Sequence, residues 1–176
     1  MTPRIRPAGP ADIGTLDAGL RALSVALGHD HRAGIAELTE AGFGREPAFV
    51  GLLAEVRAEP TSTEAGAEGV AEAGAELAGV ALISPLFSTT RGAAGVYVSD
   101  LWVAADWRGR RLGVRLLAAS RDEGARRWGA RFLRLGVGAQ NAAARGFYAR
   151  LGFTATTDET MMTLTGARLA ALEGET

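Results

Sequence analysis

The sequence predicts a single α/β domain in which helices flank a sheet. Segments rich in branched and aromatic residues alternate with segments whose apolar residues recur at helical spacing. The length of 176 residues fits one domain of ordinary size. A hydrophobic fraction of 47% and a charged fraction of 22% lie near the globular average, so composition indicates neither a disordered nor a membrane protein.

The first part of the chain predicts one strand and two helices. We expect a strand over residues 4–8 and a helix after Asp12, a suitable N-cap that precedes leucines at helical spacing. Residues 28–31 (Gly-His-Asp-His) interrupt this pattern. A second helix then follows, and Gly42 and Gly44 end it.

The next two strands are expected on either side of a segment of very different composition. Residues 48–56 and 77–84 are rich in Val, Leu, Ile and Phe. Between them, residues 57–76 are mostly Ala, Glu, Gly and Thr, with little apolar surface to offset the entropy of ordering. We expect this segment to be a long, mobile β-hairpin loop.

The second half predicts a strand, a helix, a strand, a helix and a closing hairpin. The strands are expected over residues 96–103 and 132–137, and the second helix over residues 141–151. The first helix starts near Arg110 and has one inward face, formed by Leu112, Leu116, Leu117 and Ser120. Residues 153–155 and 161–165 are expected to pair as the hairpin, and residues 167–176 form a tail.

Composition excludes several kinds of chemistry. There is no cysteine and no lysine, which rules out thiolate ligands, a cysteine nucleophile and a Schiff-base lysine. The only two histidines lie two positions apart, so we expect no metal site. The net charge of −1 and the lack of a long apolar run predict no nucleic-acid or membrane partner and a cytoplasmic location.

One loop has the residues of an anion site. After the strand that ends at Val103, glycines and arginines stand where the chain turns into a helix. The first N–H groups of a helix lack internal partners and carry the positive end of the dipole, so they can hold a diphosphate. Arg108, Arg110, Arg111 and Arg115 add side-chain charge, although such a run can equally be a solvated surface.

A second motif, residues 141–153, is explained mainly by local structure. Asn141 is a helix cap, Phe147 and Leu151 lie one turn apart, and Gly152 ends the helix. Tyr148 is not required by that account; a tyrosine beside an apolar stripe is commonly a core residue.

Together the two motifs resemble the signature of the GNAT N-acetyltransferases, Arg/Gln-x-x-Gly-x-Gly/Ala followed by Asn-x-x-Ala-x-x-Phe-Tyr. The second half matches in full at Asn141, Ala144, Phe147 and Tyr148. The first half matches from Arg108 to Gly113, except that Arg111 occupies the first glycine position. That departure is tolerable if Arg111 is not left-handed, because its N–H can then donate.

The resemblance implies a GNAT fold, with a central mixed sheet splayed between the strands at residues 96–103 and 132–137. It implies acetyl-CoA as co-substrate and a direct attack by a primary amine. It assigns Tyr148 as the acid that protonates the departing thiolate. The implied cofactor-binding residues are Leu101, Trp102, Val103, Arg108, Gly109, Arg110, Arg111, Leu112, Gly113, Val114 and Asn141.

The segment Tyr97-Val98-Ser99-Asp100-Leu101-Trp102-Val103 is also similar to the diamine and polyamine acetyltransferase branch, in which a glutamate stands where this chain has Ser99. An ammonium must lose a proton before it attacks a thioester. Strand alternation places Ser99 on the face of Tyr97 and Leu101, and Asp100 on the opposite face unless a bulge intervenes. A water chain, or His29, Asp30 and His31, are the alternative proton acceptors.

Other functions remain open at this stage. The missing glutamate and the altered glycine also fit a non-catalytic module that binds acyl-CoA as a sensor. The acceptor can be a polyamine, an amino-sugar antibiotic, an amino acid or a protein N-terminus. The resemblance allows a homodimer through the sheet edge or the closing hairpin, which the apolar pattern alone does not establish.

Overall fold

The computed structural model describes residues 1–57, 75–156 and 159–172. It divides into two compact units, Met1–Gly136 and Val137–Thr176, and each is described by itself. Most of the loop expected over residues 57–76 lies outside the described residues.

In the first unit the strands are β1 (Arg4–Pro7), β2 (Val50–Val56), β3 (Glu76–Ser88), β4 (Ala93–Val103) and β5 (Leu133–Leu135). Its helices are η1 (Pro10–Asp12), α1 (Ile13–Leu27), α2 (Ile35–Phe43), η2 (Ala105–Trp107) and α3 (Leu112–Trp128).

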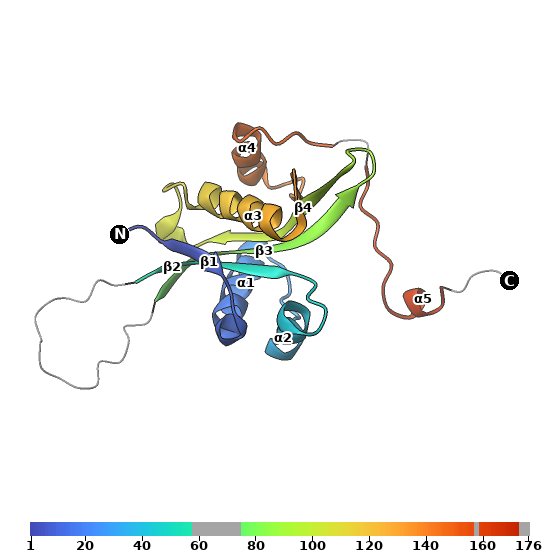
Figure 1. The fold of residues 1–176 in the computed structure, drawn as a ribbon, viewed down its shortest axis with the longest axis horizontal. Helices are drawn as coiled ribbons and strands as arrows, with labels where there is room; N and C mark the ends of the chain where they lie inside the picture. The colour runs from blue at the N-terminus through green and yellow to red at the C-terminus, as the bar shows by residue number, and fades with distance from the viewer. Residues whose placement is uncertain (58–74, 157–158, 173–176) are drawn as a thin grey trace, which may run out of the picture. The chain divides into compact units, whose positions relative to one another are not determined.

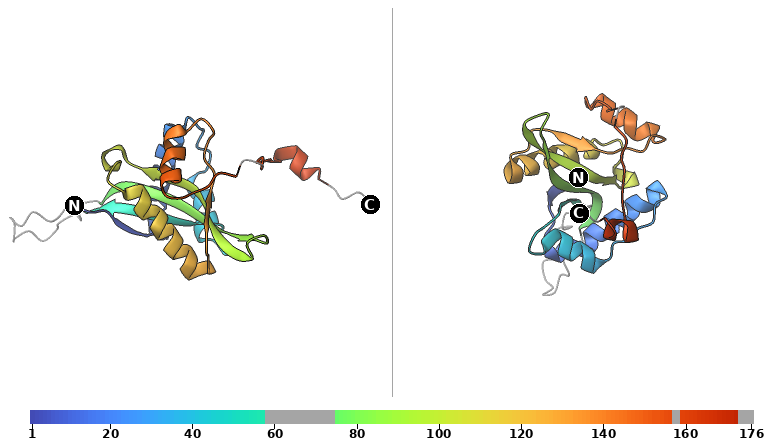
Figure 2. Two further views of the ribbon diagram at one scale, coloured as in Figure 1. Left: turned by 90° about the horizontal axis from the view of Figure 1, so that it is seen from above. Right: turned by 90° about the vertical axis from the view of Figure 1, so that its right-hand side faces the viewer.

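The five strands form one mixed sheet in sequence order. Neighbours from β1 to β4 are antiparallel, and β5 pairs with β4 in parallel. A parallel pair needs a crossover connection, and α3 supplies it. Figures 1 and 2 show α1 and α2 on one face of the sheet and α3 on the other. The predicted α/β fold, a mixed sheet flanked by helices, is confirmed.

The predicted element boundaries differ most at the β3–β4 hairpin and at β5. Strand β3 continues to Ser88 and β4 starts at Ala93, so the turn is shorter than expected and the hairpin longer. Strand β5 covers only Leu133–Leu135, whereas residues 132–137 were expected. The apolar pattern extends beyond the part of β5 that has a pairing partner on β4.

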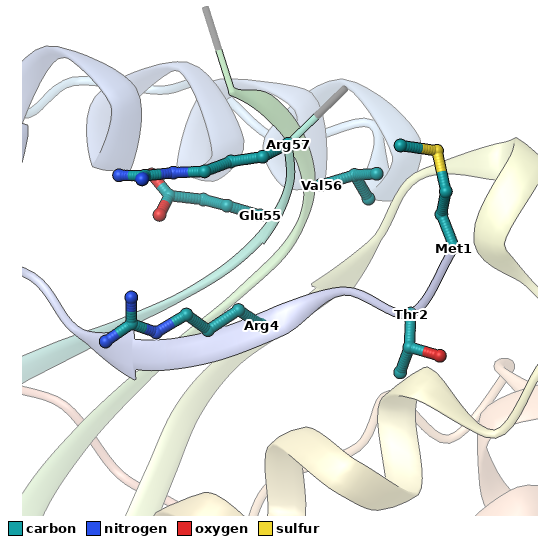
Figure 3. Close-up of a pocket in the computed structure, with 6 residues that line it drawn as sticks. All are labelled: Met1, Thr2, Arg4, Glu55, Val56 and Arg57. Carbon is teal, nitrogen blue, oxygen red and sulfur yellow. The ribbon is translucent and has the colours of Figure 1, made fainter. Parts of the chain in front are cut away.

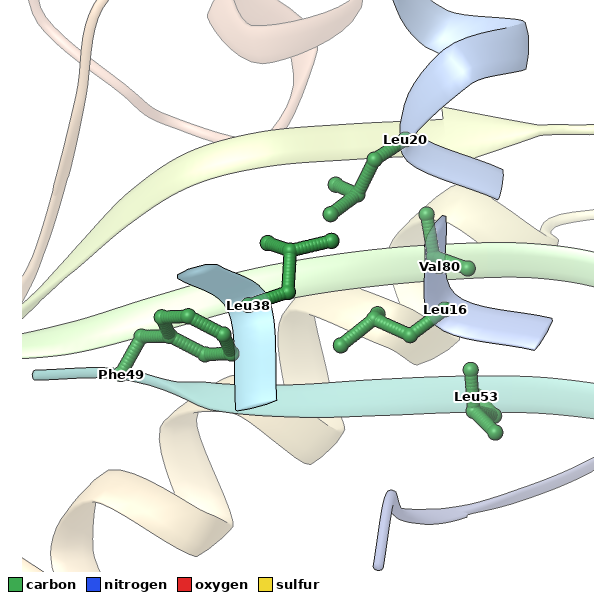
Figure 4. Close-up of a cluster of buried hydrophobic side chains, with 6 residues drawn as sticks. All are labelled: Leu16, Leu20, Leu38, Phe49, Leu53 and Val80. Atoms are coloured by element: carbon green, nitrogen blue, oxygen red, sulfur yellow. The ribbon is translucent and has the colours of Figure 1, made fainter. Parts of the chain in front are cut away.

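One hydrophobic cluster joins α1 and α2 to their face of the sheet (Figure 4). Its buried members are Leu16, Leu20, Leu38, Phe49, Leu53 and Val80. Gly19 lets α1 come close to β3, because a Cβ there would overlap the Val80 side chain. On the other face of the sheet, the four residues of α3 predicted to point inward are buried: Leu112, Leu116, Leu117 and Ser120. Both faces of the sheet are therefore covered.

The start of α1 differs from the expectation for Asp12. This residue is the N-cap, but its carboxylate makes no capping bond to the helix. It accepts hydrogen bonds from the Gly9 N–H at 2.7 Å and from Arg6 Nη1 at 2.6 Å. Arg6 also donates from Nε to Glu55 at 2.8 Å, so one half-buried guanidinium ties β1 to β2 and to the start of α1.

The second unit contains α4 (Ala142–Arg150) and α5 (Gly166–Ala170). The predicted closing hairpin is wrong for the described residues, because neither 153–156 nor 159–165 forms a strand. Met161 and Met162 are 83% and 88% exposed, so these residues bury too little apolar surface to stabilise a pair of strands. Among the described residues, no helix is long and apolar enough to cross a bilayer.

We predict that Asp12→Asn lowers the free energy of unfolding at pH 7 by about 1–2 kcal/mol, because Arg6 loses a charged partner. Hydrogen bonds from Arg6 hold the pKa of Asp12 at about 2, against desolvation that acts to raise it. Since a carboxylate of the unfolded chain has a pKa of about 4, this stabilisation is present above about pH 4 and is lost as the pH falls toward 2. Urea unfolding between pH 2 and pH 7 measures the difference.

The matched control is Asp122→Asn, whose ion pair with Arg121 is about two-thirds exposed on both sides. This variant should change stability little at any pH. An Asp12→Asn loss that is equally large at pH 2 and pH 7 would show that the effect does not come from the ionised carboxylate.

Candidate active site

Strand β4 contains one residue more than the facing stretch of β3. Leu82 pairs with Asp100, and the next residue of β3, Ile83, pairs with Val98. Ser99 is therefore the extra residue of a β-bulge. Its hydroxyl donates to the Leu82 carbonyl at 3.4 Å, at the long end of a hydrogen bond.

The bulge shifts which side chains share a face. Trp102 packs against the hydrophobic cluster formed with α1 and α2, and side chains alternate along a strand, so Asp100 lies on that same face. On the other side of the bulge, Val96 faces α3, next to Gly124, and Tyr97 therefore faces α1 and α2. The bulge is the exception that was allowed for unbroken alternation, and it places Asp100 on the face of Tyr97.

The end of β4 is open on one edge. Strand β5 pairs with β4 only over Val96–Val98, which leaves residues 99–103 without a β5 partner. The Ala104 N–H donates to the Ala78 carbonyl at 2.9 Å, which fixes the alternation of the backbone groups. The N–H and C=O groups of Leu101 and Val103 consequently point to the open edge, and those of Trp102 point to β3.

The loop after β4 leads into a helix start whose first backbone N–H groups have no partner within the helix. Gly109 (φ 71°) and Arg111 (φ 61°) are left-handed, and α3 begins at Leu112. The helical hydrogen-bond ladder starts with the Arg115 N–H, which donates to the Arg111 carbonyl at 3.1 Å. The N–H groups of residues 112–114 precede this ladder. Left-handed residues next to right-handed ones form concave nests of N–H groups that attract anions.

Arg111 is the one residue other than glycine with positive φ in the described part of the chain. The condition under which its replacement of glycine was considered tolerable is therefore not met. The left-handed conformation costs a side-chain-bearing residue roughly 1–2 kcal/mol. The loop keeps the backbone geometry that a glycine would adopt, and it does so under strain.

The arginine side chains of this region have different partners. Arg108 Nε donates to the Val103 carbonyl at 3.1 Å, and the Arg110 guanidinium lies 5.2 Å from the centre of the Trp107 ring. Arg115 donates to the Pro3 carbonyl at 2.6 Å and so fastens α3 to the start of the chain. Its side chain serves the fold, although the sequence suggested that it adds charge to the loop.

Asn141 and Tyr148 lie in the second unit. The predicted cap is confirmed, because Asn141 Oδ1 accepts the Ala144 N–H at 3.0 Å. The Tyr148 ring makes edge contacts with Phe147 at 5.1 Å and Phe153 at 5.5 Å between centroids. Burial raises the pKa of the Tyr148 phenol, which therefore stays protonated at neutral pH. Gly152 (φ 87°) follows the helix, as predicted.

The His-Asp-His segment does not act as one group. Asp30 forms an exposed pair with Arg32, whereas His31 turns inward and its Nε2 lies 3.0 Å from the Asp17 carboxylate on α1. Asp17 is a polar residue of this contact that the motifs in the sequence did not indicate. Its signal is a polar stripe on α1, in which Asp17, Arg21 and Ser24 recur at helical spacing.

A pocket of about 200 Å³ opens beside the start of β1 and the end of β2 (Figure 3). Its lining is Met1, Thr2, Arg4, Glu55, Val56 and Arg57. None of the residues predicted for the site contributes to it. The candidate site of the first unit is instead the open edge of β4 together with the loop that leads into α3.

Comparison with known proteins places the chain in a family. The model of the acetyltransferase (GNAT) family matches residues 35–153. No curated protein matches the sequence.

Three solved structures share the fold at low identity. An integron cassette protein from the mobile metagenome of V. cholerae is 16% identical, covers 97% of this chain and 96% of its own, and has a TM-score of 0.68. An aminoglycoside acetyltransferase from an uncultured soil metagenomic sample is 18% identical over 94% and 100% of the two chains (TM-score 0.64). A ribosomal-protein-alanine N-acetyltransferase from Brucella melitensis biovar Abortus 2308 is 16% identical over 92% and 99% (TM-score 0.64). Because the family model covers more than half of its length, the chain belongs to the acetyltransferase (GNAT) family.

Proposed function

We propose that this acetyltransferase transfers the acetyl group of acetyl-CoA to a primary amine by direct attack. The observation that carries the proposal is the open end of β4, which is followed, after η2, by a loop and helix start whose N–H groups precede the α3 hydrogen-bond ladder. An extended thioester arm with a diphosphate at one end needs this pair of features: a free strand edge and, next to it, an anion site.

The proposed cofactor contacts follow from the backbone directions. Leu101 bonds the amide groups of the pantetheine arm through its edge-facing N–H and C=O groups. Val103 does so through its N–H, because its carbonyl accepts the Arg108 Nε–H. Trp102 makes no backbone bond to the arm, because its N–H and C=O groups point to β3. It lies in the strand between the two residues that do. The diphosphate lies on the N–H groups of residues 109–114, and the side chains of Arg108 and Arg110 add positive charge beside them.

Asp100 is the proposed proton acceptor for the incoming ammonium. The bulge at Ser99 places the Asp100 side chain on the face of Tyr97. Within the described residues, the Asp100 carboxylate forms no ion pair. In the reaction the amine nitrogen, once deprotonated, attacks the acetyl carbon. The C–N bond forms, the C–S bond breaks, and the leaving thiolate takes a proton from the Tyr148 phenol. The nitrogen then releases its second proton to water, and water reprotonates the phenolate.

The acceptor class is tested by an amine panel of spermidine, kanamycin, an alanine-starting peptide and free amino acids, with detection of the released thiol. Kanamycin and the alanine peptide are included because similar folds occur in an aminoglycoside acetyltransferase and a ribosomal-protein-alanine N-acetyltransferase. Turnover of one amine supports the proposal. Acetyl-CoA binding with no turnover of any amine would favour a non-catalytic acyl-CoA-binding module.

For Asp100→Asn we expect kcat at pH 7 to fall by about 10²- to 10⁴-fold, the usual contribution of a general base. The loss should shrink as the pH approaches that at which the free amine predominates, because the amine then needs no acceptor. Asp106→Asn, a change in η2 two residues before the loop, is the control and should leave kcat near that of the wild type. An unchanged kcat in Asp100→Asn would remove this residue from the mechanism.

For Tyr148→Phe we expect kcat to fall by about 10- to 100-fold while the affinity for acetyl-CoA changes less than twofold, because only the hydroxyl is removed. Stopped-time thiol release gives kcat, and calorimetric titration gives the affinity. Tyr97→Phe removes the chain's other phenol, which lies on the face of Asp100, and shows whether the loss is specific to Tyr148. If Tyr148→Phe turns over at the rate of the wild type, Tyr148 is a packing residue of the aromatic group with Phe147 and Phe153.

A further inference from the structure

The segment between α1 and α2, residues 28–34, is fixed at both ends by backbone bonds. At its start Gly28 is left-handed (φ 69°) and the His29 N–H donates to the Ser24 carbonyl at 2.9 Å. At its end the Gly34 N–H donates to the Glu37 carboxylate at 3.0 Å. These bonds hold the ends of the segment but not its middle.

The middle is held by a buried polar contact with α1. His31 Nε2 lies 3.0 Å from Asp17 Oδ1, and His31 Nδ1 lies 3.4 Å from Ser24 Oγ. The imidazole is 14% exposed, whereas the neighbouring side chains of Asp30 and Arg32 are more than 80% exposed. Within this segment the imidazole is thus selectively turned toward the helix.

The Asp17 carboxyl group takes part in this contact in its ionised form. Burial opposes its ionisation, but hydrogen bonds from Arg21 and His31 outweigh burial and hold the pKa of the carboxyl below its usual range. Arg21 is half exposed, so without His31 the buried carboxylate would keep a single, solvated partner. The contact is therefore costly to lose.

Ser24, His31 and Asp17 stand in the order of a hydrolase triad, but they do not form one. The Ser24 hydroxyl donates to the Leu20 carbonyl one turn back at 3.1 Å, so its proton and its orientation are committed to the helix. We call the contacts of His31 with Asp17 and Ser24 the clamp, because they hold the segment against α1.

The clamp is connected to the Asp100 face of β4 by packing. Ala33, two residues after His31, packs against the hydrophobic cluster of α1 and α2. Trp102 packs against the same cluster and shares a face of β4 with Asp100. A shift of residues 31–33 away from α1 would disturb the cluster against which Trp102, on the face of Asp100, is packed.

We infer that Asp17 and His31 are positioning residues that hold the segment between α1 and α2 against α1 and the cluster beside the Asp100 face, and thereby set the KM for the acceptor amine. This inference rests on the proposed function. The pair leaves the loop before α3 untouched, so acetyl-CoA binding does not depend on it.

The test compares His31→Ala, His31→Gln and Asp17→Asn with His29→Ala, a change at an exposed histidine of the same segment. Deuterium exchange of residues 28–34 is measured first, in the absence of any amine. We expect exchange there to rise at least about fivefold in His31→Ala and Asp17→Asn and to stay unchanged in His29→Ala. Gln places an N–H donor near the position of Nε2, so His31→Gln should restore much of the protection.

Kinetics with the panel amine that is turned over give the second readout. The clamp predicts that KM for that amine rises about five- to tenfold in His31→Ala, with kcat and the KM for acetyl-CoA within about twofold and with recovery in His31→Gln. Two results would overturn the inference: unchanged exchange in His31→Ala, or a fall in kcat together with equal rises in the KM for the amine and the KM for acetyl-CoA. If no amine is turned over, the proposed function fails, and the exchange measurement still decides whether the clamp exists.

Discussion

The extra residue at position 99 of β4 is the feature on which the proposed active site depends. With uninterrupted pairing, Asp100 would face α3 and the apolar layer beneath it. The bulge absorbs one residue, which places Asp100 on the face of α1 and α2. The same strand loses its β5 partner directly after Val98, so the change of face and the open edge coincide. A proton acceptor and a strand edge free for an extended ligand therefore arise within a few residues of one another.

The loop before α3 shows how a backbone conformation can persist after the residue that suits it has changed. Arg111 adopts a left-handed conformation that glycine adopts without strain. Strained residues persist where the surrounding structure determines them, and they concentrate at functional sites. Here the surrounding bonds include the first rung of the α3 ladder, from the Arg115 N–H to the Arg111 carbonyl, and the tie from the Arg115 side chain to Pro3. The geometry of the loop is thus supported from α3 and from the start of the chain.

Periodicity and end signals predicted the order of strands and helices in the first unit, because most leucines of α1 and α3 and most apolar residues of β2 are buried. The Asn141 cap and the Gly152 end of α4 were predicted for the same reason, since they are local chemistry. The bulge at Ser99 has no local signature, because it results from pairing with a strand distant in sequence. The Asp17–His31 contact joins residues 14 positions apart across a turn, which periodicity cannot indicate. The closing hairpin is wrong for the described residues, in which Met161 and Met162 are exposed and belong to no strand.

The most direct test of this account is a calorimetric titration with acetyl-CoA of the wild-type protein beside Arg111→Gly. The account predicts micromolar binding by the wild type and equal or tighter binding by Arg111→Gly, because glycine keeps the left-handed loop without strain and the backbone N–H groups hold the diphosphate. Absence of binding in the wild type would contradict the proposed cofactor site. Binding that is lost in Arg111→Gly would show that the guanidinium, and not the backbone of the loop, holds the ligand.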